Sequence, residues 1–373
     1  MDTHNKMTRD FRNKLQALLA RKANHKCMYP GCTQPAINAH AISKEYALRG
    51  IAKDGILIHP EPLRSDEDIY CRIKFCEVGI QKASTFKGFC KTHDSTFGAL
   101  DKTGINTLGD VFLQLYRSFA NIVFVDNAYL ASARHAGDHE NFNQDFELSK
   151  PISASRGLSL SYDLLDGYNN STEQLPPYDK LKLTPFSSVA GMNADVLIRR
   201  IHFPCPVALH KRFVIREEGI YHDTFVFVVP SATTSMMIIV CDPRHTESFF
   251  AKVHTEIDTL NFIESCMICD GDWWMDPAVM KKWSAAKLDI LEGDYWNFHE
   301  ISFLNQYDIS IFDDIRTQLC VSLSAEERDR EIRKIDTLPK RKDIFLRQVS
   351  LSMKVHKDKQ DINKKFPGGN ILD

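Results

Sequence analysis

Cysteine and histidine pairs are the residues of this 373-residue chain whose types and spacing could do chemistry. The stretch "CMYPGC" places Cys27 and Cys32 on either side of a Pro-Gly turn, which can direct both sulfur atoms towards one point. The stretch "CKTHD" contains Cys90, His93 and, directly after it, Asp94. Structural zinc takes four tetrahedral sulfur or nitrogen ligands, usually in two closely spaced pairs. We therefore expect Cys27, Cys32, Cys90 and His93 to bind one Zn²⁺.

Two further cysteine pairs are weaker candidates for a metal site. Cys71 and Cys76 have the same spacing as Cys27 and Cys32, but "IYCRIKF" is typical of a strand. Positions five apart on a strand point to opposite faces, so this pair is disfavoured. Cys266 and Cys269 in "CMICDGDWW" have no second pair nearby, and we expect them to be buried as small apolar residues.

The charge is distributed unevenly along the chain. The formal net charge is only −2, but residues 1–26 carry seven Lys or Arg against two Asp, a surplus of five. Residues 324–373 carry thirteen Lys or Arg against nine acidic residues, a surplus of four, so the residues between sum to −11. Basic ends permit contact with a polyanion, although an ordinary solvated surface has the same composition.

The hydropathy pattern argues against membrane insertion. No apolar run approaches the roughly 18 residues that span a bilayer, and "MDTHNKMTRDF" is too polar for a signal peptide. We therefore expect a cytoplasmic protein with no membrane partner. In that reducing compartment, close cysteine pairs indicate metal binding rather than disulfides.

The periodicity of apolar residues predicts an α+β protein. Amphipathic spacing predicts helices over residues 7–23 and 107–125, and residues 137–192 have the composition of a polar loop. The runs "DVLIRRIHF", "TFVFVVP" and "TSMMIIVC" are typical of strands. Helical patterns follow at 246–265, 277–291 and 309–320. Strands followed by helices favour α+β with an antiparallel sheet over alternating α/β.

These patterns divide the chain into five expected segments. Residues 24–105 are rich in Cys, His, Gly and Pro, and such a segment needs a metal to compensate for its small core. We expect the following order: a basic amphipathic helix (1–23), a small zinc-stapled module (24–105), a helical connector (106–149), a larger α+β domain (150–323), and a charged helix with a polar tail (324–373).

The stretch "INAHAIS" places His40 between the two zinc pairs. With these residues, the segment 24–105 resembles the HNH endonucleases, the treble-clef branch of the ββα-metal nucleases. The resemblance implies that Cys27, Cys32, Cys90 and His93 form a zinc knot holding a ββα module. It also implies that His40 is the general base and that Asp94 binds a catalytic Mg²⁺ or Mn²⁺. Neighbouring helix positions point about 100° apart, so His93 and Asp94 can serve different metal ions.

The segment departs from the family pattern at two places. Ala39 stands where the family has an acidic residue or a histidine as a metal ligand. The family's middle asparagine, which orients the catalytic loop, would fall near Ser84 and Thr85. A hydroxyl can replace an amide there, although it offers fewer hydrogen bonds. Asp94 would then be the clear protein ligand of the catalytic ion, which Mg²⁺ tolerates because it keeps several waters.

The resemblance implies a metal-dependent endonuclease that hydrolyses phosphodiester bonds, with double-stranded DNA favoured as substrate. Related architectures suggest an antiviral defence or toxin effector, in which residues 150–373 bind a regulatory partner or form a homo-oligomer. Another interpretation is a non-catalytic zinc-stabilised module that binds nucleic acid or protein, with His40 a structural histidine and Asp94 a helix N-terminal residue. An active site within the C-terminal domain is a third.

Overall fold

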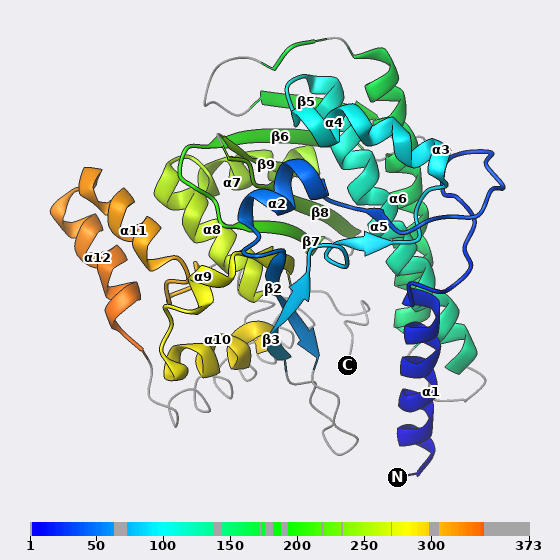
Figure 1. Cartoon of the computed structure of the whole chain (residues 1–373), viewed down its shortest axis with the longest axis horizontal. Coiled ribbons are helices and arrows are strands. Elements are labelled where there is room, and N and C mark those ends of the chain that lie inside the picture. Colours follow the sequence, from blue (N-terminus) through cyan, green and yellow to red (C-terminus); the bar gives the residue numbers. More distant parts are fainter. Residues whose placement is uncertain are drawn as a thin grey trace. The chain divides into compact units, whose positions relative to one another are not determined.

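The computed structural model describes residues 2–62, 73–136, 144–171, 173–175, 182–187, 193–217, 220–232, 234–269, 271–297 and 306–338. The chain forms two compact units, each built from separate stretches of sequence. Figure 1 shows the helices and strands, coloured in chain order. Unit 1 comprises Met1–Leu48, Gln81–Tyr178 and Pro185–Ala194, and unit 2 comprises Arg49–Ile80, Asp179–Thr184 and Asp195–Asp373. Residues 49–80, which the sequence places inside the zinc-stapled segment, thus belong to unit 2.

Unit 1 contains the long helices α1 (Asp2–Leu19), α5 (Leu108–Ala136) and α6 (Gln144–Asn170). The two helices predicted over 7–23 and 107–125 are therefore confirmed as α1 and α5. The polar loop predicted over 137–192 is wrong, because α6 occupies much of it. Helix α6 lies against α5, and it buries apolar side chains at helical spacing, Leu160, Leu164 and Leu165. Residue 150, near which the sequence suggests a domain boundary, lies within α6.

Short elements of unit 1 lie between the cysteine and histidine pairs in the sequence and directly after them. Strands β1 (Ala39–His40) and β4 (Thr85–Phe86) form a two-stranded antiparallel sheet. The remaining short elements are η1 (Lys44–Leu48), α3 (Lys91–Asp94), η2 (Ser95–Phe97) and α4 (Gly98–Thr103).

Unit 2 is built on a sheet of eight strands in the order β3-β2-β10-β7-β8-β9-β6-β5. The neighbouring strands from β3 to β6 in this order all pair antiparallel. This confirms an α+β protein with an antiparallel sheet, and β6, β8 and β9 confirm the three predicted strands. The bounds are β2 (Ile56–Pro62), β3 (Ile73–Gly79), β5 (Lys182–Ser187), β6 (Asn193–Ile201), β7 (Val207–Glu217), β8 (Ile220–Val229), β9 (Ser235–Cys241) and β10 (Asp272–Met275).

Apart from the short α2, the helices of unit 2 follow the last long strands, as the sequence predicts. One apolar face of the sheet packs with α8 and α10, and Cys266 and Cys269 are buried in this core as expected. None of the described helices combines the length and hydropathy needed to cross a bilayer. The bounds are α2 (Arg49–Ile51), η3 (Pro243–His245), α7 (Thr246–Lys252), α8 (Glu256–Ile268), α9 (Pro277–Met280), α10 (Ala285–Asn297), α11 (Asp313–Leu319), η4 (Cys320–Ser322) and α12 (Ala325–Asp336).

A buried ionic network fastens α11 and α12 to α8. The guanidinium of Arg316 is fully buried and pairs with the carboxylates of Glu264 and Glu331. The ammonium of Lys334 lies 3.1 Å from Glu331 and 2.7 Å from the side-chain oxygen of Asn261. These charges compensate one another, which lets four ionised side chains remain inside unit 2.

Candidate metal centre

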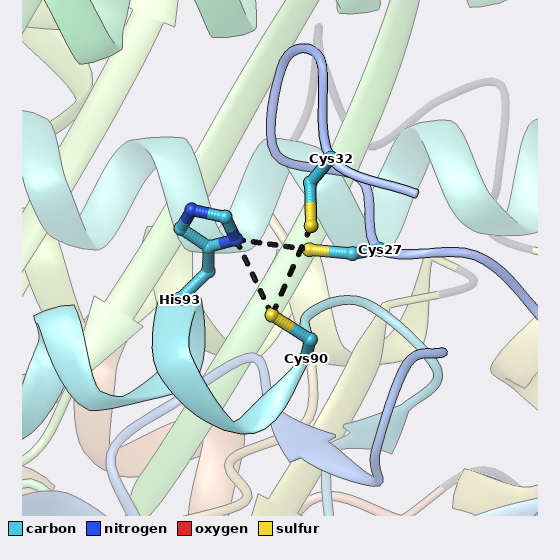
Figure 2. A group of neighbouring side chains, drawn as sticks. All are labelled: Cys27, Cys32, Cys90 and His93. Carbon is cyan, nitrogen blue, oxygen red and sulfur yellow. Dashed lines mark hydrogen bonds between the residues drawn. The ribbon is translucent and has the colours of Figure 1, made fainter. Parts of the chain in front are cut away.

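A tight turn brings the first cysteine pair together. The backbone nitrogen of Cys32 donates a hydrogen bond to the carbonyl of Tyr29 at 3.0 Å, and Gly31 has φ +74°. Glycine adopts this left-handed conformation without the steric cost that a side chain would impose. The nitrogen of Cys27 also donates to the carbonyl of Gln34 at 2.8 Å, which closes the loop. Both thiols consequently point to the same side of the turn (Figure 2).

The second pair is presented by the start of α3. Cys90 precedes the helix as its N-cap, and the nitrogen of Asp94 donates to the carbonyl of Cys90 at 2.8 Å. The two halves of the site are joined through the backbone, because the nitrogen of Met28 donates to the carbonyl of Gly88 at 2.7 Å. The first cysteine turn and the start of α3 are therefore held together by main-chain bonds as well as by any shared ion.

The four ligand atoms of Cys27, Cys32, Cys90 and His93 all lie within 4.8 Å of one another. Nδ1 of His93 is 3.4 Å from Sγ of Cys27 and 3.3 Å from Sγ of Cys90. Sγ of Cys32 is 3.9 Å from Sγ of Cys90. A tetrahedral zinc ion with bonds of about 2.3 Å to sulfur and about 2.0 Å to nitrogen would set these separations at roughly 3.5–3.8 Å. The cluster is therefore compatible with zinc (Figure 2).

The surroundings of the cluster act in opposite directions on its thiols. Burial raises the pKa of the Cys27 thiol to about 11, whereas the backbone N–H of His93 lowers the pKa of Cys90. A divalent ion would bring the thiols into their thiolate form, because a metal replaces the proton on sulfur. The ring of Tyr29 stacks on that of His93 with centroids 3.8 Å apart, which fixes the orientation of the imidazole.

The competing cysteine pair does not contribute to the cluster. Cys76 lies in β3, where it faces His59 of β2 across the ladder, and Cys71 lies outside the described residues. Among the residues that the structure describes, the Cys27–Cys32–Cys90–His93 group is the one set of three or more possible ligands within metal-binding distance.

His40 lies in β1, directly opposite Thr85 of β4. The chain just after His40 is held by Ser84, whose Oγ accepts from the nitrogen of Ile42 at 3.3 Å. The same Oγ lies 3.4 Å from the carbonyl of Ile42, within donating distance. The hydroxyl of Thr85 instead donates locally to the carbonyl of Lys82 at 2.8 Å. Of the two residues near the family's asparagine position, Ser84 therefore makes the bonds to the loop after His40.

Asp94 is half-buried beside a charged pair that sequence analysis did not identify. Burial and the neighbouring Asp101 raise the pKa of Asp94, while Arg117 opposes them. Arg117 is 1% exposed, and its guanidinium donates to Asp101 at 2.8 Å and to Gln114 at 2.6 Å. It also lies over the ring of Phe97, 5.0 Å from the centroid. The local pattern gave no signal for this pair, because Gln114 and Arg117 lie away from the apolar stripe of the helix over 107–125.

Gln114 links this pair to the strand that carries His40. Its Nε2 donates to the carbonyl of Ala41 at 2.9 Å, one residue after His40. Helix α5 thus contacts the chain beside both candidate catalytic residues, although His40 and Asp94 themselves belong to no described ligand group of three or more.

The predicted residues therefore fall into two sets. Cys27, Cys32, Cys90 and His93 come together as one cluster. His40 lies in β1, Thr85 in β4 and Asp94 in α3, and Ser84 lies in the turn that precedes β4. No protein-family model, curated protein or solved structure gives a significant match to this chain.

Proposed function

We propose that the chain is an HNH-type, metal-dependent endonuclease that hydrolyses phosphodiester bonds in DNA. The observation that carries this proposal is the four-ligand cluster, whose ligand atoms lie within 4.8 Å of one another. Such a cluster fixes the end of α3, where Asp94 follows the ligand His93. The same unit contains the strand that carries His40.

The order of the short elements supports a treble-clef module. Strand β1 pairs antiparallel with β4, and α3 begins a few residues after β4. This order, with the cysteine turn before β1, corresponds to the ββα arrangement of the HNH family. One difference is that β1 and β4 are separated in sequence by β2 and β3, which belong to unit 2. In this proposal the zinc knot, rather than a short hairpin, holds the two strands of the module in place.

The proposed chemistry assigns one role to each polar group. An imidazole can accept a proton from water near neutral pH, which is the role of His40. The half-buried carboxylate of Asp94 would hold the second divalent ion, with waters and substrate phosphate completing its shell. Mg²⁺ or Mn²⁺ bound there would stabilise the departing 3′ oxygen. Ser84, through Ile42, keeps the segment after His40 in one conformation.

A cleavage assay tests this function directly. We expect the purified full-length protein to nick plasmid DNA with Mg²⁺ or Mn²⁺, and His40→Ala and Asp94→Ala to abolish nicking while retaining zinc. His135→Ala, at an exposed histidine near the end of α5, serves as the matched control and should cleave normally. Undiminished cleavage by the His40→Ala protein would refute the assignment.

A non-catalytic zinc module that binds nucleic acid or protein is the second candidate. Ala39 supplies no ligand, and the cation of Arg117 already acts on Asp94, where a divalent ion would have to bind. This alternative predicts one tightly held zinc ion, no weaker site for Mn²⁺, and no cleavage by the parent protein. Metal titration of the full-length chain separates the two candidates.

A further inference from the structure

The solvent-facing side of α1 carries exposed cations. Arg9 and Arg12 are exposed and lie one helical turn apart, on the same side of the helix. The chain after α1 continues with the exposed cations Arg21, Lys22 and Lys26. None of these five forms an ion pair with a residue in the described part of the chain. We call these five residues the basic strip.

The opposite side of α1 is already occupied. Phe11 contacts the ring of Tyr129 in α5 with centroids 5.8 Å apart, and α1 lies along α5 (Figure 1). Leu15 and Leu18 fall on this side and are half-buried. An amphipathic helix that binds membranes needs its apolar side for lipid. Helix α1 uses its apolar side to contact α5 of its own unit. The side that remains available to a partner is therefore the one that carries the cations.

His25 fixes the basic strip relative to the metal centre. Its Nε2 lies 2.8 Å from the carbonyl oxygen of Leu18, and the centroid of its ring lies 4.9 Å from that of Phe124 in α5. The carbonyl of His25 accepts from the nitrogen of Ala36, at 2.8 Å, within the loop that carries Cys27 and Cys32. The strip is therefore part of the same folded unit as the metal cluster, rather than a free arm.

We infer that the basic strip binds the phosphate backbone of duplex DNA and thereby places the duplex beside the metal centre. This inference rests on the proposed function for its substrate class and adds the surface that holds it. Arg9 and Arg12 lie within one turn of α1, and Arg21, Lys22 and Lys26 follow the end of the helix, so the strip offers cations at more than one point along the chain. Guanidinium and ammonium groups that occur both on α1 and in the segment after it are suited to phosphates, which recur at regular intervals, rather than to one small anion.

The salt dependence of binding provides the test. Full-length parent protein and an Arg9→Gln/Arg12→Gln/Arg21→Gln variant are titrated with a short labelled duplex, without added divalent ion, at several salt concentrations. Loss of three phosphate contacts lowers the slope of log affinity against log salt by about 2.7. The ratio of the parent's DNA affinity to that of the variant should therefore fall roughly 40-fold between about 50 and about 200 mM salt.

The matched control removes the same charge elsewhere. Lys53→Gln/Lys281→Gln/Arg333→Gln neutralises three exposed cations of unit 2 and should keep the parent's slope. Zinc content and thermal unfolding establish that both variants are folded. Equal slopes for the parent and the α1 variant overturn the inference, as does equally strong, strip-dependent binding of the parent to anionic vesicles.

The binding experiment tests the basic strip separately from the proposed nuclease function, because DNA binding is measured without cleavage. Strip-dependent binding by a parent protein that never cleaves would refute the nuclease and leave this surface in place. Cleavage by the parent with a slope unaffected by the α1 substitutions would refute the surface and leave the nuclease in place.

Discussion

The side-chain oxygen of Ser84 lies 3.3 Å from the backbone nitrogen of Ile42 and 3.4 Å from its carbonyl oxygen. Ile42 is fully buried, so no water can replace this partner. We expect Ser84→Ala to destabilise the protein by about 1–3 kcal/mol, since a buried N–H would lose its acceptor. Cleavage should fall as well, because the segment after His40 would lose its anchor. Chemical denaturation and the plasmid assay measure the two effects.

Thr85→Val is the control for that substitution. The Thr85 hydroxyl donates only to the nearby carbonyl of Lys82, in an exposed position. Its removal should change stability by less than about 1 kcal/mol, since water can take its place. Equal losses in the two variants would show that Ser84 has no special role in holding the loop.

The zinc cluster predicts a selective effect of cysteine substitution. Cys27→Ser should remove the bound zinc and destabilise unit 1, whereas Cys76→Ser should leave the zinc content unchanged, because Cys76 lies in β3. Zinc affinity should also fall as the pH is lowered. With a Cys27 pKa of about 11 in the metal-free protein, the ion must displace a proton that becomes harder to remove at low pH. Metal analysis and proton release on zinc binding provide the measurements; a zinc-replete Cys27→Ser protein contradicts the assignment.

Gly104 ends α4 in a conformation that requires glycine. Its φ is +74° and its ψ is −161°, and a Cβ there would lie 1.9 Å from the ring of Tyr46. We expect Gly104→Ala to cost at least about 2 kcal/mol, since both the backbone and the ring must shift. Gly50→Ala is the control, because a Cβ at Gly50 meets nothing within 4 Å. Thermal unfolding should separate the two variants, and similar melting temperatures would contradict the argument.

The buried network around Arg316 predicts an acid-sensitive unit 2. Burial alone would raise the pKa of Glu331, but Lys334 and Arg316 together lower it below its ordinary 4.5. A lowered carboxylate pKa contributes stability above the unfolded value, and this contribution is lost as the pH falls below about 4.5. Unfolding curves across that range should show the loss.

Replacing Arg316 tests the same network at neutral pH. Arg316→Met leaves Glu264 without its buried cation and Glu331 with Lys334 alone, and it should cost about 3–5 kcal/mol. The exposed Arg333 of α12 is the control, and Arg333→Met should have little effect. A stable Arg316→Met protein at neutral pH would mean that the network is not required for stability.

The metal cluster could be predicted from the sequence because the constraints are local. A Pro-Gly turn between Cys27 and Cys32, and one helical turn between Cys90 and His93, each bring two ligands together without long-range information. The strands β6, β8 and β9 were predictable for a similar reason, since their β-branched and aromatic runs are continuous.

The parts that sequence reasoning missed depend on distant partners. Pro151 and Gly157 disfavour a helix over 144–170, yet α6 forms there because it packs along α5. The spacing of Leu160 and Leu164 was the available signal. The positions of Gln114 and Arg117 beside Ala41 and Asp101 could not be predicted, because nothing in the local pattern specifies a contact between segments so far apart.

The excursion of residues 49–80 into unit 2 has a practical consequence for truncation experiments. Any fragment that stops near residue 105 or 150 keeps β2 but removes β10, whose Met275 pairs with Ile58. An uncovered strand edge of this kind invites intermolecular pairing and precipitation. If such a fragment is insoluble or inactive, the cause is therefore the incomplete sheet of unit 2 rather than the lack of an active site. Expressing either unit alone requires joining the polypeptide at more than one place.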